Sequence, residues 1–147
     1  AFVAASGVVG ITQLQRHHIL YRGLAPEAIV VDERGYPYFV DFRFAKSFID
    51  EGENAPNART FTLCGTPEYM SPEQVSSTGH GFESDWWALG ILIYEMLFGE
   101  PPFGGEGKNE TQVYAEISMF DGNLTFGDPS DSQVPQFSMQ HNRLKGA

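Results

Sequence analysis

The residues best able to do chemistry lie in two short stretches of the chain. The first, "YRGLAPEAIV" (21–30), has a cation and a carboxylate around small residues and ends in a β-branched run. The second, "VDFRFAK" (40–46), adds one carboxylate and two cations. A lone carboxylate is a weak site for magnesium, and glycine or alanine can neither take up a proton nor hold a metal. The charged residues are Arg22, Glu27, Asp41, Arg43 and Lys46, and the small ones are Gly23, Ala25 and Ala28.

Histidine and cysteine indicate no metal site. The histidines at 17, 18, 80 and 141 show no metal-ligand spacing. Cys64 is the only cysteine, which excludes an internal disulfide and fits a reducing compartment, so we expect an intracellular, cytoplasmic protein.

The charge balance limits the possible partners. The 147 residues include 9 Lys and Arg against 19 Asp and Glu, a net charge of −10. Nucleic acids and anionic membranes need a basic footprint, so we expect neither as a partner. A basic peptide is compatible with this charge, and so is an ordinary solvated acidic surface. No apolar run reaches the ~18 residues of a membrane span.

The pattern predicts a mainly helical α+β fold. Broad apolar coverage indicates a helix over 2–17, and "AIVVDERGYPYFVDF" (28–42) predicts two strands around a turn at Gly35. Residues 43–59 are polar and loop-like. A short helix over 71–77 and an amphipathic helix over 109–118 flank the strongest prediction, an apolar helix over 84–99 that Ser84 or Asp85 caps and Gly99 ends. Residues 121–147 indicate an irregular tail.

Four segments in this order resemble one known family. They are "YRGLAPEA", "VDFRFAK", "TFTLCGTPEYMSPE" and "DWWALGILIYEMLFGEPPF", and together they resemble the C-terminal lobe of eukaryotic Ser/Thr protein kinases. "TLCGTPEY", "DWWALG" and "GEPPF" point to the cyclic-nucleotide-dependent branch of the AGC group. The resemblance covers residues 1–120 and implies a partial kinase C-lobe, with the N-lobe and its ATP-holding residues absent from this chain.

The resemblance also implies that the catalytic residues are lost. Kinases have a catalytic Asp, a Lys and a metal-binding Asn where this chain has Gly23, Ala25 and Ala28. Asp41 matches a magnesium ligand, but Arg43 replaces the glycine that follows it in the family. The larger side chain implies a backbone cost if its φ is positive, or else a loop fixed in one state; its guanidinium could also fill the space vacated at Gly23, Ala25 and Ala28.

Regulatory and docking positions are kept. Thr62 matches the activation-loop phosphorylation site of the family, and Arg22 and Lys46 match the cations that bind that phosphate. The substrate-docking loop corresponds to Thr66, Pro67 and Glu68, whereas Glu27 and Glu95 resemble the carboxylates that bind basic residues of a peptide. Arg22, Glu27 and Glu95 are equally compatible with purely structural roles.

Two further carboxylates have structural counterparts in the family. Asp85 resembles the residue that ties the long helix to the backbone of the catalytic loop. Glu73 normally pairs with a later arginine, and the tail offers only Arg143, outside any predicted helix.

Three functional interpretations follow. The favoured one is a catalytically inactive kinase-like scaffold or regulatory subunit in a larger assembly, with no cofactor. A second adds the binding of an Arg-rich pseudosubstrate segment. The third is a part of an ATP-dependent Ser/Thr kinase of the cyclic-nucleotide-dependent type, which would use ATP and magnesium. An all-round apolar helix and an incomplete lobe also predict a partner surface or the remainder of a longer polypeptide.

Overall fold

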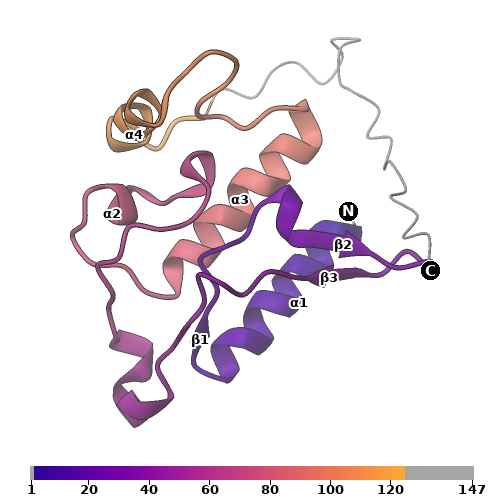
Figure 1. Cartoon of the computed structure of the whole chain (residues 1–147), viewed down its shortest axis with the longest axis vertical. Coiled ribbons are helices and arrows are strands. Elements are labelled where there is room, and N and C mark those ends of the chain that lie inside the picture. The colour runs from indigo at the N-terminus through magenta and orange to yellow at the C-terminus, as the bar shows by residue number, and fades with distance from the viewer. Residues whose placement is uncertain (1, 125–147) are drawn as a thin grey trace.

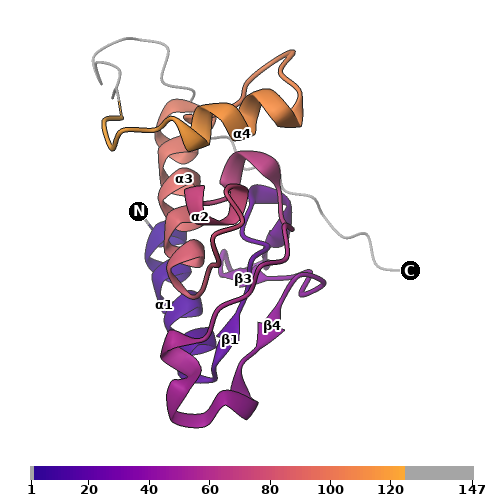
Figure 2. The ribbon, with the colours of Figure 1, turned by 90° about the vertical axis from the view of Figure 1, so that its left-hand side faces the viewer.

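The computed structural model describes residues 2–124, which form a helical body with two small sheets (Figure 1). Helices α1 (Phe2–Arg16) and α3 (Glu83–Phe98) lie side by side in both views (Figures 1 and 2). The predicted helix over 2–17 is confirmed, with Arg16 in its last turn. The tail predicted for 121–147 lies outside the described residues from 125 onward.

The predicted pair of strands around Gly35 is confirmed. Strands β2 (Ile29–Val31) and β3 (Pro37–Phe39) pair antiparallel, with Val30 opposite Tyr38. Gly35 lies in the turn with a φ of 89°, a conformation that favours glycine. The Asp32 carboxylate accepts backbone N–H groups of Arg34 and Tyr36, each at 2.9 Å, and so closes the turn.

The segment 43–59 is more regular than its polar composition predicted. Strand β4 (Lys46–Ser47) pairs with β1 (Ile19–Leu20), and a 3-10 run, η2 (Ile49–Asn57), follows. A small buried cluster of Leu20, Phe48 and Ala55 holds this segment. The prediction missed it because the apolar residues that fix the segment are few and their main partner lies in β1.

The helix predicted over 84–99 is present, but its predicted cap is wrong. The residue before α3 is Phe82, which makes no side-chain cap, and neither Ser84 nor Asp85 caps the helix. Both side chains instead make tertiary hydrogen bonds inside the protein. The predicted end at Gly99 is confirmed, with a left-handed φ of 86°.

The two remaining helices follow their predicted positions. Helix α2 (Pro72–Val75) begins after Ser71, and α4 (Glu110–Ser118) begins after Asn109, each with a reciprocal capping box. α4 and η2 lie at opposite ends of the molecule (Figures 1 and 2). Two further 3-10 turns are η1 (Pro26–Ala28) and η3 (Pro67–Tyr69).

One main core joins α1, the loop after β1, α3 and α4. Ile11, Tyr21, Leu89 and Ile117 are among its buried members. α3 is buried less completely than predicted, because Leu97 is 54% exposed near its end. No helix among residues 2–124 is long and apolar enough to cross a membrane.

Candidate functional site

The loop 21–28 is held in place by a buried carboxylate from α3. Asp85, which is fully buried, accepts the backbone N–H groups of Tyr21 and Arg22, each at 2.8 Å, so the contact predicted between Asp85 and this loop is confirmed. Arg22 has a left-handed φ of 58°, which these bonds help to fix. Burial raises the pKa of Asp85 to about 6, although the two N–H groups and the Arg22 charge act in the opposite direction.

Tyr21 ties the same loop to the segment around Asp41. Its hydroxyl donates to the Val40 carbonyl, and its ring stacks on Phe39 with centroids 5.2 Å apart. Burial, followed by the charges of Asp41 and Asp85, raises the pKa of Tyr21 to about 12, so it stays a hydrogen-bond donor at neutral pH. Tyr21 therefore connects the stretch 21–30 directly to the stretch 40–46.

The small residues of the loop lie against the Asp41 segment. Ala28 accepts the backbone N–H of Val40 at 2.9 Å, and a Cβ at Gly23 would lie 3.6 Å from the Asp41 carbonyl oxygen. That distance is an ordinary contact, so the backbone at residue 23 leaves room for a side chain. Ala25 and Ala28 are 2% and 6% exposed. Gly23, Ala25 and Ala28 thus bring no proton-transferring or metal-binding group to this place.

Asp41 is already paired. Its carboxylate accepts the Arg43 side-chain N–H at 2.7 Å, and this bond is the main reason that the pKa of Asp41 lies below its usual range. The neighbouring position, Ala28, has no ligand oxygen in its side chain. Within residues 2–124, no group of three or more His, Cys, Asp or Glu side chains is placed to hold a metal. The side chains present do not fit a magnesium site.

The structure decides two of the alternatives raised for Arg43. Its φ is not positive, so the predicted backbone cost does not arise, whereas Asp41 has a φ of 62°. The guanidinium turns out toward Asp41 with 69% of the side chain exposed, rather than filling the space beside Gly23. The reason is local: an arginine two residues after an aspartate reaches the carboxylate without leaving solvent.

Arg22, one of the two cations predicted to bind a phosphate at Thr62, lies beside the segment that leads to Thr62. Arg22 donates to the Phe44 carbonyl at 2.7 Å and approaches the Thr60 hydroxyl at 3.5 Å. The Lys46 ammonium lies 5.4 Å from the centre of the Phe48 ring. Neither cation has a carboxylate within 4 Å in the described part of the chain. The Thr62 side chain is exposed, two residues from the threonine that Arg22 approaches.

Two of the predicted docking carboxylates, Glu27 and Glu68, act on a third, Glu95. Glu95 accepts a hydrogen bond from the Tyr69 hydroxyl, and burial and the charges of Glu27 and Glu68 raise the pKa of Glu95. Glu68 lies in η3, just after Thr66, with its side chain against Gly104. The charges that act on Glu95 of α3 therefore come from two other elements, Glu27 of η1 and Glu68 of η3.

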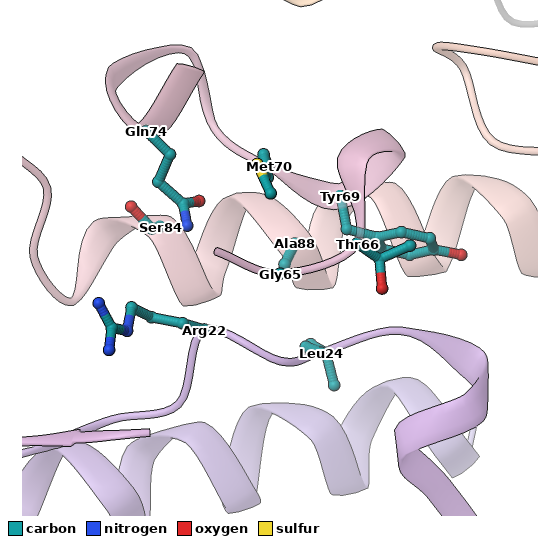
Figure 3. Close-up of a pocket in the computed structure, with 9 residues that line it drawn as sticks. All are labelled: Arg22, Leu24, Gly65, Thr66, Tyr69, Met70, Gln74, Ser84 and Ala88. Atoms are coloured by element: carbon teal, nitrogen blue, oxygen red, sulfur yellow. The ribbon is translucent and has the colours of Figure 1, made fainter. Parts of the chain in front are cut away.

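A small cavity lies between the loop and α3 (Figure 3). Its volume is about 10 Å³, roughly what one water needs. Figure 3 shows Arg22 and Leu24 from the loop on one side, Ser84 and Ala88 from α3 behind it, and the segment from Gly65 to Gln74 on the other side. Its small volume and polar rim suit a bound water rather than a substrate.

The buried polar residues beside this cavity satisfy one another. The Ser71 and Ser84 hydroxyls lie 3.0 Å apart, and Ser84 donates to Glu73 at 3.1 Å. Gln74 approaches the Cys64 carbonyl at 3.4 Å. Glu73 makes no ion pair with an arginine within residues 2–124, and Arg143 lies outside them.

Sequence patterns did not single out His80, which the structure places opposite Thr60. His80 is 1% exposed and pairs backbone to backbone with Thr60, with both N–H···O distances at 2.9 Å. Neither ring nitrogen has a hydrogen-bond partner among residues 2–124. Burial, and after it the Arg22 charge, lowers the pKa of His80. A histidine four residues before the start of an apolar helical pattern carries no signal of burial.

The comparisons with known proteins agree that the chain is similar to protein kinases. Residues 1–144 match a family model described as "Protein kinase domain". The "cAMP-dependent protein kinase catalytic subunit" of Dictyostelium discoideum is 51% identical over 125 residues, which are 85% of this chain and 17% of that protein. The "cAMP-dependent protein kinase catalytic subunit PRKX" of Mus musculus is 51% identical over 116 residues, 79% of this chain and 30% of that protein. The chain thus spans less than a third of either relative.

Proposed function

Because this chain belongs to the protein kinase domain family, we propose that it is a catalytically inactive C-lobe module that serves as a scaffold or regulatory subunit. The observation that carries this proposal is the composition of the site. Gly23, Ala25 and Ala28 stand where the family has its catalytic Asp, Lys and Asn, and Asp41 is paired with Arg43. The proposed module covers residues 1–120 and works inside the cell without a cofactor.

The expected loss of rate is large. A positioned general base contributes about 10²–10⁴ in rate, and a single group that stabilises developing charge contributes about 10²–10³. Gly23 leaves the loop without the general base, and Ala25 and Ala28 leave it without groups that stabilise the developing charge. The surrounding loop keeps its shape, because Asp85 binds the backbone rather than any of these side chains.

The test is a phosphotransfer assay on the protein purified from its source. We expect no transfer from ATP to an Arg-containing peptide above the rate of a denatured control. A matched variant that combines Gly23→Asp, Ala25→Lys and Ala28→Asn shows whether the missing side chains alone account for the loss. Robust activity of the unchanged protein that Asp41→Ala abolishes would overturn the proposal.

A basic peptide segment is the ligand that the surface supports best. The charges of Glu27 and Glu68 act on Glu95, and a cationic side chain of a bound peptide would relieve that repulsion. We expect a peptide with paired arginines to bind more weakly to a Glu27→Gln, Glu95→Gln variant. A variant with Gln at the exposed residues Glu100 and Glu106 is the control. Equal affinities of all three proteins would exclude this site.

We also propose Thr62 as a phosphorylation site that Arg22 and Lys46 bind. Both cations lack a carboxylate partner in the described residues of a protein whose net charge is −10. A phosphothreonine carries nearly two negative charges and forms strong bonds to such cations. Phosphorylation should therefore protect the loop from proteolysis after Arg59, and Arg22→Met with Lys46→Met should remove that protection.

The exposed apolar face of α1 and the β2–β3 hairpin supports a larger assembly. Phe2, Val9, Val30 and Phe42 are each 46–60% exposed, and a groove of about 290 Å³ runs between the helix and the hairpin. We propose that another protein surface covers this face in the native complex. A monomer of native mass near 16.3 kDa that stays soluble without partners would contradict it.

The alternative is a part of an active Ser/Thr kinase of the cyclic-nucleotide-dependent type, with ATP and magnesium as cofactors. It is supported by the names of the relatives and by their greater length. The denatured mass of the source protein separates the two functions. A mass of a full-length kinase would favour the alternative and make ATP binding the next measurement.

A further inference from the structure

A short antiparallel contact joins the segment that leads to Thr62 to the residues just before α3. Thr60 and His80 exchange two backbone N–H···O bonds of 2.9 Å each, and the two residues are only 2% and 1% exposed. His80 is therefore the central residue of this contact, and its ring has almost no access to solvent.

Side-chain contacts flank the bridge on both sides. Arg59 pairs with Glu83 at 3.7 Å on one side. On the other side the Phe61 ring lies against Gly79, where an added Cβ would be 2.8 Å from the ring. We call this contact the clasp, and it consists of residues 59–61 and 79–83.

The closed clasp holds an imidazole that is disfavoured in its protonated form. Neither ring nitrogen of His80 has a hydrogen-bond partner among residues 2–124, so no carboxylate there accepts an N–H from the ring. A buried charge without such a partner is strongly disfavoured, because the surrounding protein does not replace the water that it has lost. Opening the clasp would expose both nitrogens to water, where an imidazole is protonated below a pH of about 6.5.

The charged groups that act on the ring come from four elements. Arg22 of the catalytic-loop segment and Lys46 of β4 oppose its protonation. Glu73 of α2 and Glu83 of α3 favour it. Burial is the largest influence, and it lowers the pKa of His80.

We propose that the clasp is an acid-sensitive latch, in which protonation of His80 opens the contact and frees the segment that carries Thr62 from the body of the protein. The proton comes from solvent, and no covalent bond changes. The latch would work equally in an active or an inactive kinase-like protein, so it does not depend on the proposed function.

The pH dependence has a defined sign and range. Above a pH of about 6.5 the imidazole is neutral whether the clasp is open or closed, so the clasp has its full stability. As the pH falls below this value, only the open clasp takes up a proton, and opening becomes more favourable by up to about tenfold per pH unit. The effect levels off once the pH reaches the lowered pKa of His80 in the closed clasp.

The experiment measures hydrogen exchange of single backbone amides by NMR in the full chain, at a pH of about 7.5 and of about 5.5. Protection is expressed relative to an unstructured peptide at the same pH, which removes the intrinsic pH dependence of exchange. We expect the protection of the Thr60 and His80 amides to fall several-fold at the lower pH, and by about tenfold at most. The Asp32 amide, which donates to the Tyr36 carbonyl at 2.9 Å, is the internal control and should keep its protection.

Two variants separate the imidazole from the other charged groups. His80→Gln keeps a polar side chain that cannot titrate, so its Thr60 amide should be equally protected at both pH values. His17→Gln removes an exposed histidine outside the clasp and should keep the pH effect of the unchanged protein.

Three results would overturn the proposal. The first is equal protection of the Thr60 amide at both pH values in the unchanged protein. The second is a pH effect that persists in His80→Gln, because Glu73 or Glu83 would then be the group that titrates. The third is a parallel loss at Asp32, which would show general unfolding instead of opening of the clasp. If His80→Gln does not fold, the comparison of Thr60 with Asp32 in the unchanged protein still decides.

Discussion

Gly65→Ala tests the contact that joins the loop 21–28 to the segment after Thr62. Gly65 has a φ of 117°, where residues with a side chain are strained, and an added Cβ would lie 2.8 Å from the Arg22 carbonyl oxygen. Because that atom belongs to the backbone, it cannot move aside as the end of a flexible side chain would. The substitution therefore acts on the loop that carries the cation of the proposed phosphate site.

The magnitude has two parts. The strained backbone costs about 1–3 kcal/mol, and forcing an extra carbon into a packed place costs about 1–3 kcal/mol more. Gly35→Ala is the matched control, since its φ is 89° and nothing lies within 4 Å of the added carbon. It should show only the backbone part.

The assay is urea unfolding of the three proteins at pH 7, followed by far-UV circular dichroism. We expect the free energy of unfolding to fall by roughly 2–6 kcal/mol for Gly65→Ala and by about 1–3 kcal/mol for Gly35→Ala, with similar m-values. Equal losses for the two variants would refute the reasoning, because they would show that residue 65 and the Arg22 carbonyl are not in close contact.

Three further measurements address the core and the charged groups. Ile117→Ala should lower the free energy of unfolding by about 2–5 kcal/mol in urea, because it removes a fully buried side chain from the core between α3 and α4. Arg43→Ala should raise the pKa of Asp41 in an NMR titration. In the unchanged protein the lowered pKa of Asp41 stabilises the fold at neutral pH, and that stabilisation is lost as the pH falls through the folded-state pKa. The variant should therefore lose less stability than the unchanged protein over that pH range. Glu27→Gln should lower the pKa of Glu95, because it removes one of the charges that raise it. A raised folded-state pKa of Glu95 destabilises the fold as the pH rises above the unfolded-state pKa, so the variant should lose less stability over that range.

The elements with strong local signals were predictable. The helix over 84–99 has an apolar run and a terminal glycine, and the hairpin around Gly35 has β-branched strands and a turn residue, so each is specified by nearby residues. The start of α3 was not predictable. Asp85 looks like a helix cap in the sequence, but its carboxylate accepts the backbone N–H of Tyr21, 64 residues away. Local rules cannot distinguish a cap from a tertiary anchor.

The candidate site was predictable in its composition and in the contact of Asp85 with the loop, but not in its other contacts. The absence of a proton-transferring or metal-binding side chain at Gly23 and Ala28 is plain from the sequence, whereas the Tyr69 contact to Glu95 depends on packing between η3 and α3. The 3-10 run after β4 and the burial of His80 were missed for the same reason. Both depend on a few distant residues that have no periodic pattern.

The anchoring of the loop at Asp85 has a consequence for how this sequence can change over time. The carboxylate accepts hydrogen bonds from main-chain N–H groups, which every residue except proline provides. An added Cβ at residue 23 would make only ordinary contacts. Selection for a stable protein therefore retains Asp85 but does not constrain the residue type at position 23. Chemistry at this loop can be lost, or regained, by single codon changes that folding does not oppose.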